Sequence, residues 1–354
     1  MIHTGEERLP TPSPGARHDN HFNLIRMVLA TLVIVSHSPE IIYGDRSHEL
    51  LTRLFHTLSF GDFAVNGFFL LSGYLIVQSW QLSPLAGSFL KKRILRIYPG
   101  FIAASLVCAL LIGPFAGNAD YWLHFRWPTF LAGMLRLDEP AIPPVFQGSH
   151  HPFINASMWT IPYEFICYLL VLAFGMTSGA RMKTAWGATT AAIALVDLTN
   201  GAGLTAFHPL GPHYLSFFTF FFFGGSYYLF RDHISFSRKG ALIALALFIL
   251  TMCSRRFVEL GDALFFGYLL FGMAGAKCGR LLAYNRLPDI SYGVYLYAWP
   301  VGKLLLAARP DTSATALVMQ TFVLAVACGL ASWYLVERPF LRLKTLRMPW
   351  TMTA

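Results

Sequence analysis

Residues 22–39, FNLIRMVLATLVIVSHSP, place two ionisable side chains inside one apolar segment. Arg26 and His37 have ten residues between them, so eleven helical steps return the second side chain to within ~20° of the first, ~16 Å along the axis. Ionisable groups inside a membrane are costly and usually face the bundle interior or a wet cavity. The segment therefore predicts a membrane helix with a functional face. The simpler alternative is that Arg26 reaches the inner interface and His37 merely ends the helix.

The composition is that of a polytopic membrane protein. Of the 354 residues, 55% are hydrophobic and 13% are charged, which is roughly half the charged fraction of an average soluble chain. The net charge of +9 does not indicate a nucleic-acid partner, because the basic residues lie mostly between apolar segments, where membrane topology accounts for them. The five cysteines lack metal-ligand spacing, so we expect them to pack as small hydrophobic side chains.

Ten apolar stretches have the length of membrane helices and lack the alternating pattern of barrel strands. They predict an all-α fold, a polytopic transmembrane bundle of about ten helices. We expect a membrane domain at residues 21–340, a disordered cytosolic tail at 1–20 and a cytosolic tail at 341–354. The stretches lie near residues 22–38, 60–80, 97–113, 157–175, 184–199, 213–230, 240–254, 260–277, 290–307 and 315–335.

The distribution of Lys and Arg predicts the orientation. With a cytosolic N-terminus, 18 of the 27 basic residues fall in cytosolic segments and 8 in external ones, with Arg26 inside the first span. This bias satisfies the positive-inside rule, so both termini should be cytosolic, with His37 toward the outside. The longest external segment, residues 114–156, either covers an external site or is a simple interfacial loop.

Polar residues recur inside several other apolar segments. Asn66 and Ser72 can bond across helices, either for packing or as part of a site. Glu164 needs a partner, for which an arginine is the obvious candidate, and a purely structural ion pair is the alternative. Tyr292 and Tyr295 either satisfy buried polar atoms or anchor the helix at the interface.

Two arginines share a helical face at the predicted cytosolic edge. Arg93 and Arg96 stand at positions i and i+3, and guanidinium groups match the geometry of phosphate oxygens. The pair therefore predicts a site for the phosphates of a cytosolic ligand, although positive-inside anchoring also explains it. The adjacent His150 and His151 are too weak a pattern to predict a metal.

One aromatic run is most simply explained as bulk that faces lipid. Five phenylalanines lie within residues 218–223 together with Phe217 just before them, and Gly224 and Gly225 follow, where they permit close approach of helices.

In this order, the segments resemble the acyltransferase-3 family of integral membrane acyltransferases, of the sugar O-acetyltransferase type. The resemblance spans residues 22–340 and rests on six motifs in sequence. The matching residues are Arg26 and His37; Phe68, Phe69, Ser72, Gly73 and Leu75; Arg93, Arg96, Tyr98 and Pro99; Trp159 and Glu164; Ser291, Tyr292, Tyr295 and Leu296; and Glu337, Arg338 and Pro339.

The chain departs from the family pattern at two positions. Asn66 stands where many members have Asp, and Ala298 stands where many have His. These positions cannot supply a carboxylate or a second imidazole, so the catalytic burden falls on His37 and Glu164.

The resemblance implies transfer of an acyl group, usually acetyl from acetyl-CoA, to a sugar hydroxyl of a surface glycan or lipid-linked glycan precursor. We expect a multi-pass protein of the bacterial inner membrane, surrounded by lipid and without a metal or nucleic acid. Arg93 and Arg96 would hold the CoA phosphates, with Arg26 deeper, near the thioester or pantetheine.

Two variants of the chemistry stay open. His37 either removes the proton of the acceptor hydroxyl or carries the acyl group covalently. Glu164 would orient the histidine or balance Arg26. Asn66, Ser72, Tyr292, Tyr295 and Trp159 would support the substrates or the structure.

A transporter is the competing class. Ten helices with a buried Arg, His and Glu also describe a proton-coupled carrier or a flippase. Internal symmetry would favour that class, and none stands out in the sequence.

Overall fold

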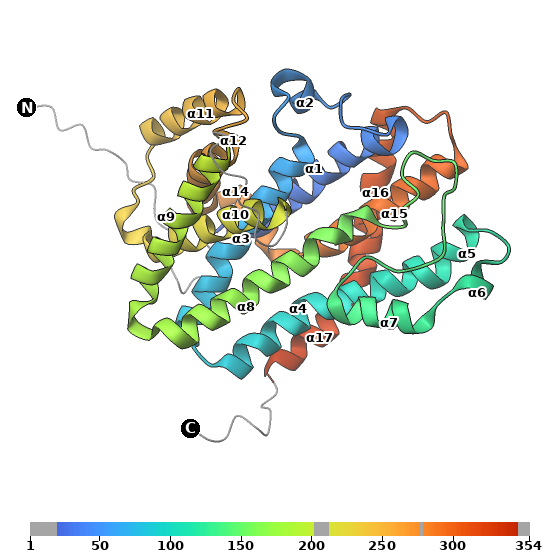
Figure 1. Cartoon of the computed structure of the whole chain (residues 1–354), viewed down its shortest axis with the longest axis horizontal. Coiled ribbons are helices and arrows are strands. Elements are labelled where there is room, and N and C mark those ends of the chain that lie inside the picture. The colour runs from blue at the N-terminus through green and yellow to red at the C-terminus, as the bar shows by residue number, and fades with distance from the viewer. Residues whose placement is uncertain (1–19, 202–211, 277–278, 346–354) are drawn as a thin grey trace, which may run out of the picture. The chain divides into compact units, whose positions relative to one another are not determined.

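A computed structural model of the chain describes residues 20–201, 212–276 and 279–345, which are predominantly helical (Figure 1). These residues form no β-strand and contain one isolated bridge, between Gly117 and Val145. The all-α prediction is therefore confirmed. Of the two predicted tails, residues 1–19 and 346–354 lie outside the described part of the chain.

Long helices make up most of the described chain, with short helices and single turns between them. The long ones are α1 (Phe22–Tyr43), α3 (Phe60–Leu82), α4 (Ala86–Leu106), α7 (Trp127–Arg136), α8 (Ile161–Ser178), α9 (Met182–Gly201), α10 (Pro212–Leu229), α11 (Arg238–Met252), α13 (Gly267–Gly275), α15 (Ser291–Ala308) and α16 (Ala314–Ser332). The short ones are α2 (Leu50–Phe55), α5 (Gly113–Ala116), α6 (Tyr121–His124), α12 (Val258–Gly261), α14 (Gly279–Leu282) and α17 (Arg338–Arg342). Wider π-helical turns occur at η1 (Val107–Ile112), η5 (Asp262–Phe266) and η7 (Trp333–Glu337), and 3-10 turns at η2 (Ala156–Thr160), η3 (Gly179–Arg181), η4 (Arg231–His233), η6 (Ala283–Arg286) and η8 (Leu343–Thr345).

Several helical segments have the properties of membrane spans, as expected of an integral membrane protein. One of them, Ala156–Asn200, holds two of the stretches predicted as separate spans. Helices α10, α11 and α15 are not among the segments that qualify by length and hydropathy. The predicted number of ten spans therefore stays a prediction. By length and hydropathy, 6 segments of the described residues qualify: Phe22–Tyr43, Phe60–Leu82, Ala86–Ala116, Ala156–Asn200, Val258–Gly275 and Ala314–Arg342.

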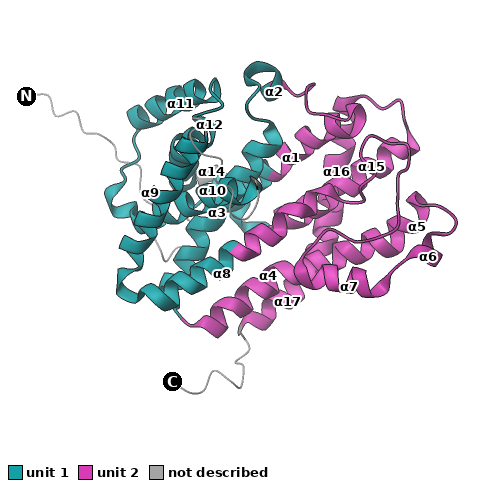
Figure 2. Cartoon of the chain, viewed as in Figure 1, with its two compact units in different colours: residues 1–29, 51–84, 167–287 teal, residues 30–50, 85–166, 288–354 magenta. Residues whose placement is uncertain are grey.

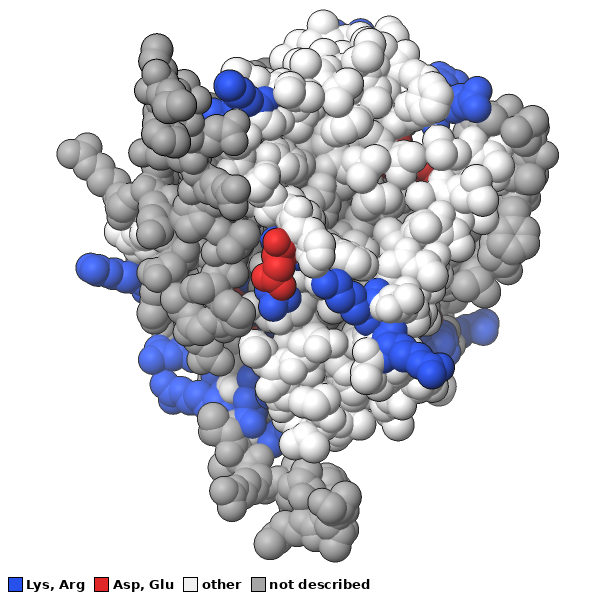
Figure 3. Space-filling model, turned by 90° about the vertical axis from the view of Figure 1, so that its left-hand side faces the viewer, with Lys and Arg blue, Asp and Glu red and all other residues white. Residues whose placement is uncertain are grey.

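Large apolar side chains are exposed along these helices, as lipid contact requires. On α11, Leu242 and Leu250 are 69% and 66% exposed, and on α16 Met319 is 64% exposed. Figure 3 shows one face of the molecule on which uncharged residues cover most of the described surface and the few charged side chains are mainly Lys and Arg.

The chain divides into two compact units (Figure 2). Unit 1 holds residues 1–29, 51–84 and 167–287, and unit 2 holds residues 30–50, 85–166 and 288–354. Helices α1 and α8 each contribute to both units. Most of the predicted site residues belong to unit 2, and only Arg26, Asn66 and Ser72 belong to unit 1.

Close packing of α3 against α10 organises unit 1. A Cβ atom on Gly73 would collide with the carbonyl oxygen of Phe221, and one on Gly224 with that of Leu70. The glycines therefore permit backbone contact between the two helices. Phe220 and Phe221 are fully buried, so the expectation that the whole phenylalanine run faces lipid is wrong. The run fills the core of this unit because Gly73 on α3 lets α10, which carries the phenylalanines, approach α3 closely.

In unit 2, helix α15 packs against α16, and Trp299 is buried with Ile41 and Leu317. The segment 114–156, predicted to be external, has a core of its own, in which Tyr121, Phe130 and Phe146 pack with residues of η1. The Tyr121 hydroxyl donates a hydrogen bond of 2.8 Å to the carbonyl of Ala109. Residues 114–156 are therefore a packed part of unit 2 and more than a simple loop.

Candidate active site

His37 is buried in the part of α1 that belongs to unit 2, with 8% of the residue exposed. Its Nδ1 lies 2.8 Å from Oε2 of Glu40, which stands three residues later on the same helix. The rings of Trp299 and His37 lie nearly perpendicular, with 4.8 Å between their centroids and an angle of 89° between their planes. The imidazole is therefore held by a carboxylate and by an indole.

Helix α1 continues beyond His37 to Tyr43, with Pro39 inside it. The alternative in which His37 merely ends the helix is therefore wrong. Because the helix continues, position 40 falls near the face that carries His37. The His-x-x-Glu spacing of residues 37–40 is the sequence signal for this contact, but Glu40 lies just beyond the apolar stretch that predicts the helix.

Arg46 completes a short chain of ionic contacts. Its Nε donates a hydrogen bond of 3.0 Å to Oε2 of Glu40, the same oxygen that faces His37. The Glu40 side chain is 17% exposed and that of Arg46 is 28% exposed. A half-buried arginine thus stabilises the ionised form of Glu40 beside the imidazole.

Residues 149–153, at the end of the segment that is predicted to be external, contact α15 and the end of α1 close to this histidine. The buried ammonium of Lys303 donates hydrogen bonds of 2.6 Å to Oγ of Ser149 and to the carbonyl of His151. Trp299 Nε1 donates to the carbonyl of Phe153 at 3.3 Å, and Nε2 of His151 lies 3.0 Å from the carbonyl oxygen of Gly44. Residues 149–153 therefore lie along α15 and the end of α1, on the Trp299 side of His37.

A second polar group surrounds Tyr295. Its hydroxyl lies 2.7 Å from Oγ1 of Thr160, and both residues are buried. Glu164, Arg46 and Glu139 interact electrostatically with this hydroxyl. Burial within residues 114–156 raises the pKa of the Glu139 carboxyl. Glu164 and Arg46, both of unit 2, are thus within electrostatic range of the Tyr295 hydroxyl.

Three of the sequence motifs meet at Arg96. Its guanidinium lies 2.9 Å from a carboxylate oxygen of Asp289 and 3.6 Å from one of Glu337. The Glu337 side chain is 2% exposed and also accepts a hydrogen bond of 3.1 Å from Ser332. The guanidinium lies 5.8 Å from the ring centre of Tyr292. Arg96 is therefore already paired with two carboxylates. Phosphate binding, its predicted role, does not require these partners.

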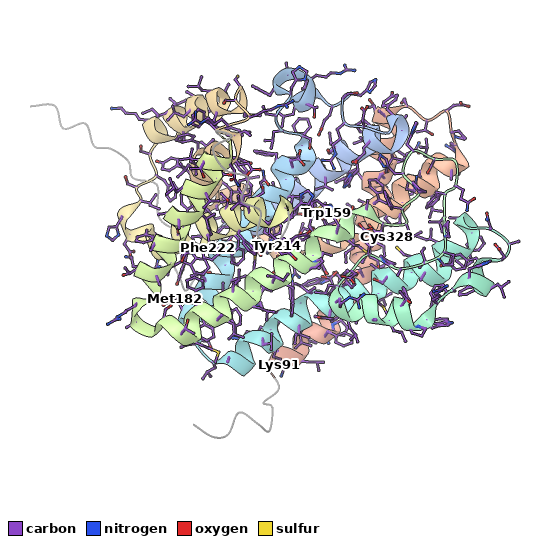
Figure 4. The ribbon with its side chains drawn as sticks, in the orientation of Figure 1. Lys91, Trp159, Met182, Tyr214, Phe222 and Cys328 are labelled. Atoms are coloured by element: carbon purple, nitrogen blue, oxygen red, sulfur yellow. The ribbon has the colours of Figure 1, made fainter. Side chains whose placement is uncertain are left out.

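Arg93 has a different environment on the same helix. Its guanidinium lies over the ring of Phe89 at 5.6 Å, one turn toward the start of α4. Lys91, labelled in Figure 4, lies on this same early part of the helix. The other predicted residue of this unit, Trp159, is in η2 and contacts the Tyr163 ring at 5.9 Å.

In unit 1, Asn66, which stands where many family members have Asp, has a hydrogen-bond partner. The amide of Asn66 donates a hydrogen bond of 2.7 Å to Oδ2 of Asp262, which is fully buried. The hydroxyl of Ser72 lies 3.3 Å from that of Tyr168. Asn66 thus binds a carboxylate instead of supplying one. The sequence signal was an aspartate inside the apolar stretch 260–277. Arg26, on α1, also belongs to this unit.

The described residues contain no group of three or more His, Cys, Asp or Glu side chains arranged to hold a metal ion.

His37 is thus a buried histidine against a carboxylate, on a helix with the length and hydropathy of a membrane span. The chain matches the model of an acyltransferase domain over residues 19–337. It belongs to the acyltransferase-3 family of membrane acyltransferases. The family does not favour the transporter interpretation.

Curated relatives match the chain over most of its length. An O-acetyl transferase of Shigella phage Sf6 is 27% identical over 330 residues, which cover 91% of this chain and 96% of the relative. Nodulation protein 10 of Rhizobium leguminosarum bv. viciae is 28% identical over 363 residues, covering 95% and 97%. Acyltransferase MdmB of Streptomyces mycarofaciens is 30% identical over 150 residues, covering 41% and 36%. No solved structure matches the chain significantly.

Proposed function

We propose that the protein transfers an acetyl group from acetyl-CoA to a hydroxyl of a cell-surface glycan or of a lipid-linked glycan precursor. The observation that carries this proposal is the buried imidazole of His37 against a carboxylate. Such an imidazole is suited to take a proton from a hydroxyl near neutral pH. The name of the phage relative, an O-acetyl transferase, supports acetyl as the group and oxygen as the acceptor atom.

His37 takes the proton of the acceptor hydroxyl as the hydroxyl oxygen attacks the thioester carbonyl. The tetrahedral intermediate then collapses, the C–S bond breaks, and the proton passes from His37 to the departing CoA sulfur. In the covalent variant, His37 first takes the acyl group from CoA and the acceptor oxygen then removes it. Tyr295 and Glu164, both in unit 2, support the reacting groups in either variant.

The donor's phosphates bind at the start of α4 in this proposal. Arg93 is the main contact, because Arg96 already faces the carboxylates of Asp289 and Glu337. Arg96, held by these carboxylates, keeps this part of α4 in position for the donor. Arg26 acts deeper, near the thioester or pantetheine. We place the protein in a bacterial inner membrane, which the bacterial and phage origins of its relatives support.

Arg93→Ala is expected to weaken acetyl-CoA binding by about tenfold or more, since a hydrogen bond to a charged group contributes about 1.5–3 kcal/mol. Arg93→Lys should recover part of the affinity, because an ammonium keeps the charge but loses the bidentate geometry. Calorimetric titration of purified protein measures both. Arg238→Ala, which removes a basic residue at the start of α11, is the matched control and should bind as the wild type does. Unchanged affinity in Arg93→Ala would exclude Arg93 as a phosphate ligand.

The proposed orientation has both termini in the cytosol and residues 114–156 outside. In a background without native cysteines, an impermeant thiol reagent should label Arg136→Cys in intact cells and should label Lys183→Cys only after the membrane is opened. The opposite labelling pattern would reverse the topology.

A further inference from the structure

The carboxylate of Glu40 determines which nitrogen of His37 carries a proton. Oε2 of Glu40 lies 2.8 Å from Nδ1 of His37 and 3.0 Å from Nε of Arg46. An ionised carboxylate can only accept hydrogen bonds, and the neighbouring guanidinium favours the ionised form. Nδ1 of His37 must therefore be the donor.

The tautomer has a chemical consequence for the other ring nitrogen. In a neutral imidazole with its proton on Nδ1, Nε2 carries the lone pair. A carboxylate on Nδ1 also stabilises the imidazolium that forms when Nε2 takes a proton, as in the hydrolytic triads. Nε2 is thus the atom prepared to act as base or nucleophile.

The orientation of the ring is fixed as well. Glu40 holds Nδ1 from the next turn of α1, while the ring of Trp299, on α15, packs against the imidazole at an angle of 89° between the ring planes. Trp299 is itself held through Nε1 by the carbonyl of Phe153. Rotation of the imidazole would break the bond to Glu40 or collide with the indole.

We infer that Glu40, held by Arg46, is a positioning residue that sets the tautomer and orientation of His37. The inference rests on the proposed function for its catalytic consequence, but the contact itself does not depend on it. Glu40 was not among the candidates that the sequence and the family resemblance supply. A purely structural role, in which Glu40 and Arg46 close the turn after α1, would leave the reactivity of His37 unchanged.

The first test compares three variants in membranes that hold the native acceptor, with acetyl-CoA as the donor. Glu40→Ala is expected to lower the apparent kcat by about 10²-fold, the upper range for loss of a supporting carboxylate. The KM for acetyl-CoA should change less than about twofold, because the donor phosphates bind elsewhere. Glu40→Gln keeps an acceptor oxygen for Nδ1–H without the charge, so its kcat should lie between those of Glu40→Ala and the wild type. Arg46→Met should lower kcat by less than Glu40→Ala does.

The second test measures the chemical reactivity of His37 directly and needs no acceptor substrate. Diethyl pyrocarbonate is added to purified protein, and the rate of modification of the His37 peptide is measured by mass spectrometry. The rate should fall at least threefold in Glu40→Gln, a variant close in size to the wild type. Modification of the exposed His124 in the same samples is the control and should not change.

The two tests separate failure of the inference from failure of the proposed function. An unchanged or faster reaction of His37 in Glu40→Gln would overturn the positioning role, even if the wild type transfers acetyl groups. Equal kcat values for Glu40→Ala and the wild type would overturn it too. A slower reaction of His37 together with an inactive wild type would support the positioning role and reject acyl transfer.

Discussion

Substitution of His37 by alanine is expected to abolish acyl transfer, with a loss of about 10²–10⁴-fold, the usual cost of removing a general base. The loss would be at least as large if His37 carries the acyl group, because no covalent intermediate could then form. The fold should survive, since alanine is a good helix former and Arg46 remains to pair with Glu40. Transfer of labelled acetyl from acetyl-CoA to the glycan fraction of membranes measures the effect.

His124→Ala is the matched control for this experiment. His124 has an exposed side chain beside Asp120, far along the sequence from every predicted motif, and its removal should leave transfer unchanged. Near-normal transfer by a well-expressed His37→Ala variant would remove His37 from the mechanism.

Arg96→Ala is expected to destabilise the protein strongly, by about 3–5 kcal/mol in free energy of unfolding. The reason is the charge that it leaves behind. Glu337 is 2% exposed and Asp289 is 13% exposed, and an uncompensated buried carboxylate is costly. The same variant should also loosen the packing of α4, because Arg96 joins this helix to Asp289, just before α15, and to Glu337 in η7. Thermal unfolding of the purified protein in detergent measures the loss.

A compensating variant tests the cause of that loss. Combining Arg96→Ala with Glu337→Gln and Asp289→Asn removes the unpaired charges and should recover much of the stability. Arg342→Ala, an exposed arginine on α17, should unfold like the wild type. If Arg96→Ala also unfolds like the wild type, the ion pairs do not stabilise this unit.

The sequence was sufficient to predict helices and the residues that carry motifs, because both depend on local patterns. Apolar stretches of helical length predicted an all-α membrane protein, and the spacing of Arg26 and His37 placed both on one helix. The predicted stretch ended at residue 38, just before Pro39. A proline removes one backbone hydrogen bond, but α1 continues to Tyr43, which brings Glu40 to His37.

Partners that lie far apart in sequence could not be predicted. Asn66 bonds to Asp262, 196 positions away, and Arg96 to Asp289, 193 positions away. Several buried carboxylates in this chain could have satisfied either group, and nothing local selects among them. The phenylalanine run shows the same limit, since hydrophobicity alone does not separate a side chain that faces lipid from one in a core of helices.

We expect this membrane protein to acylate a glycan through His37. The most direct measurement is mass spectrometry of surface glycans and lipid-linked precursors from cells that make the wild type, the His37→Ala variant or no protein. An acetyl modification on a sugar hydroxyl should be present in cells with the wild type and absent from the other two. The same modification in all three, or in none, would contradict it.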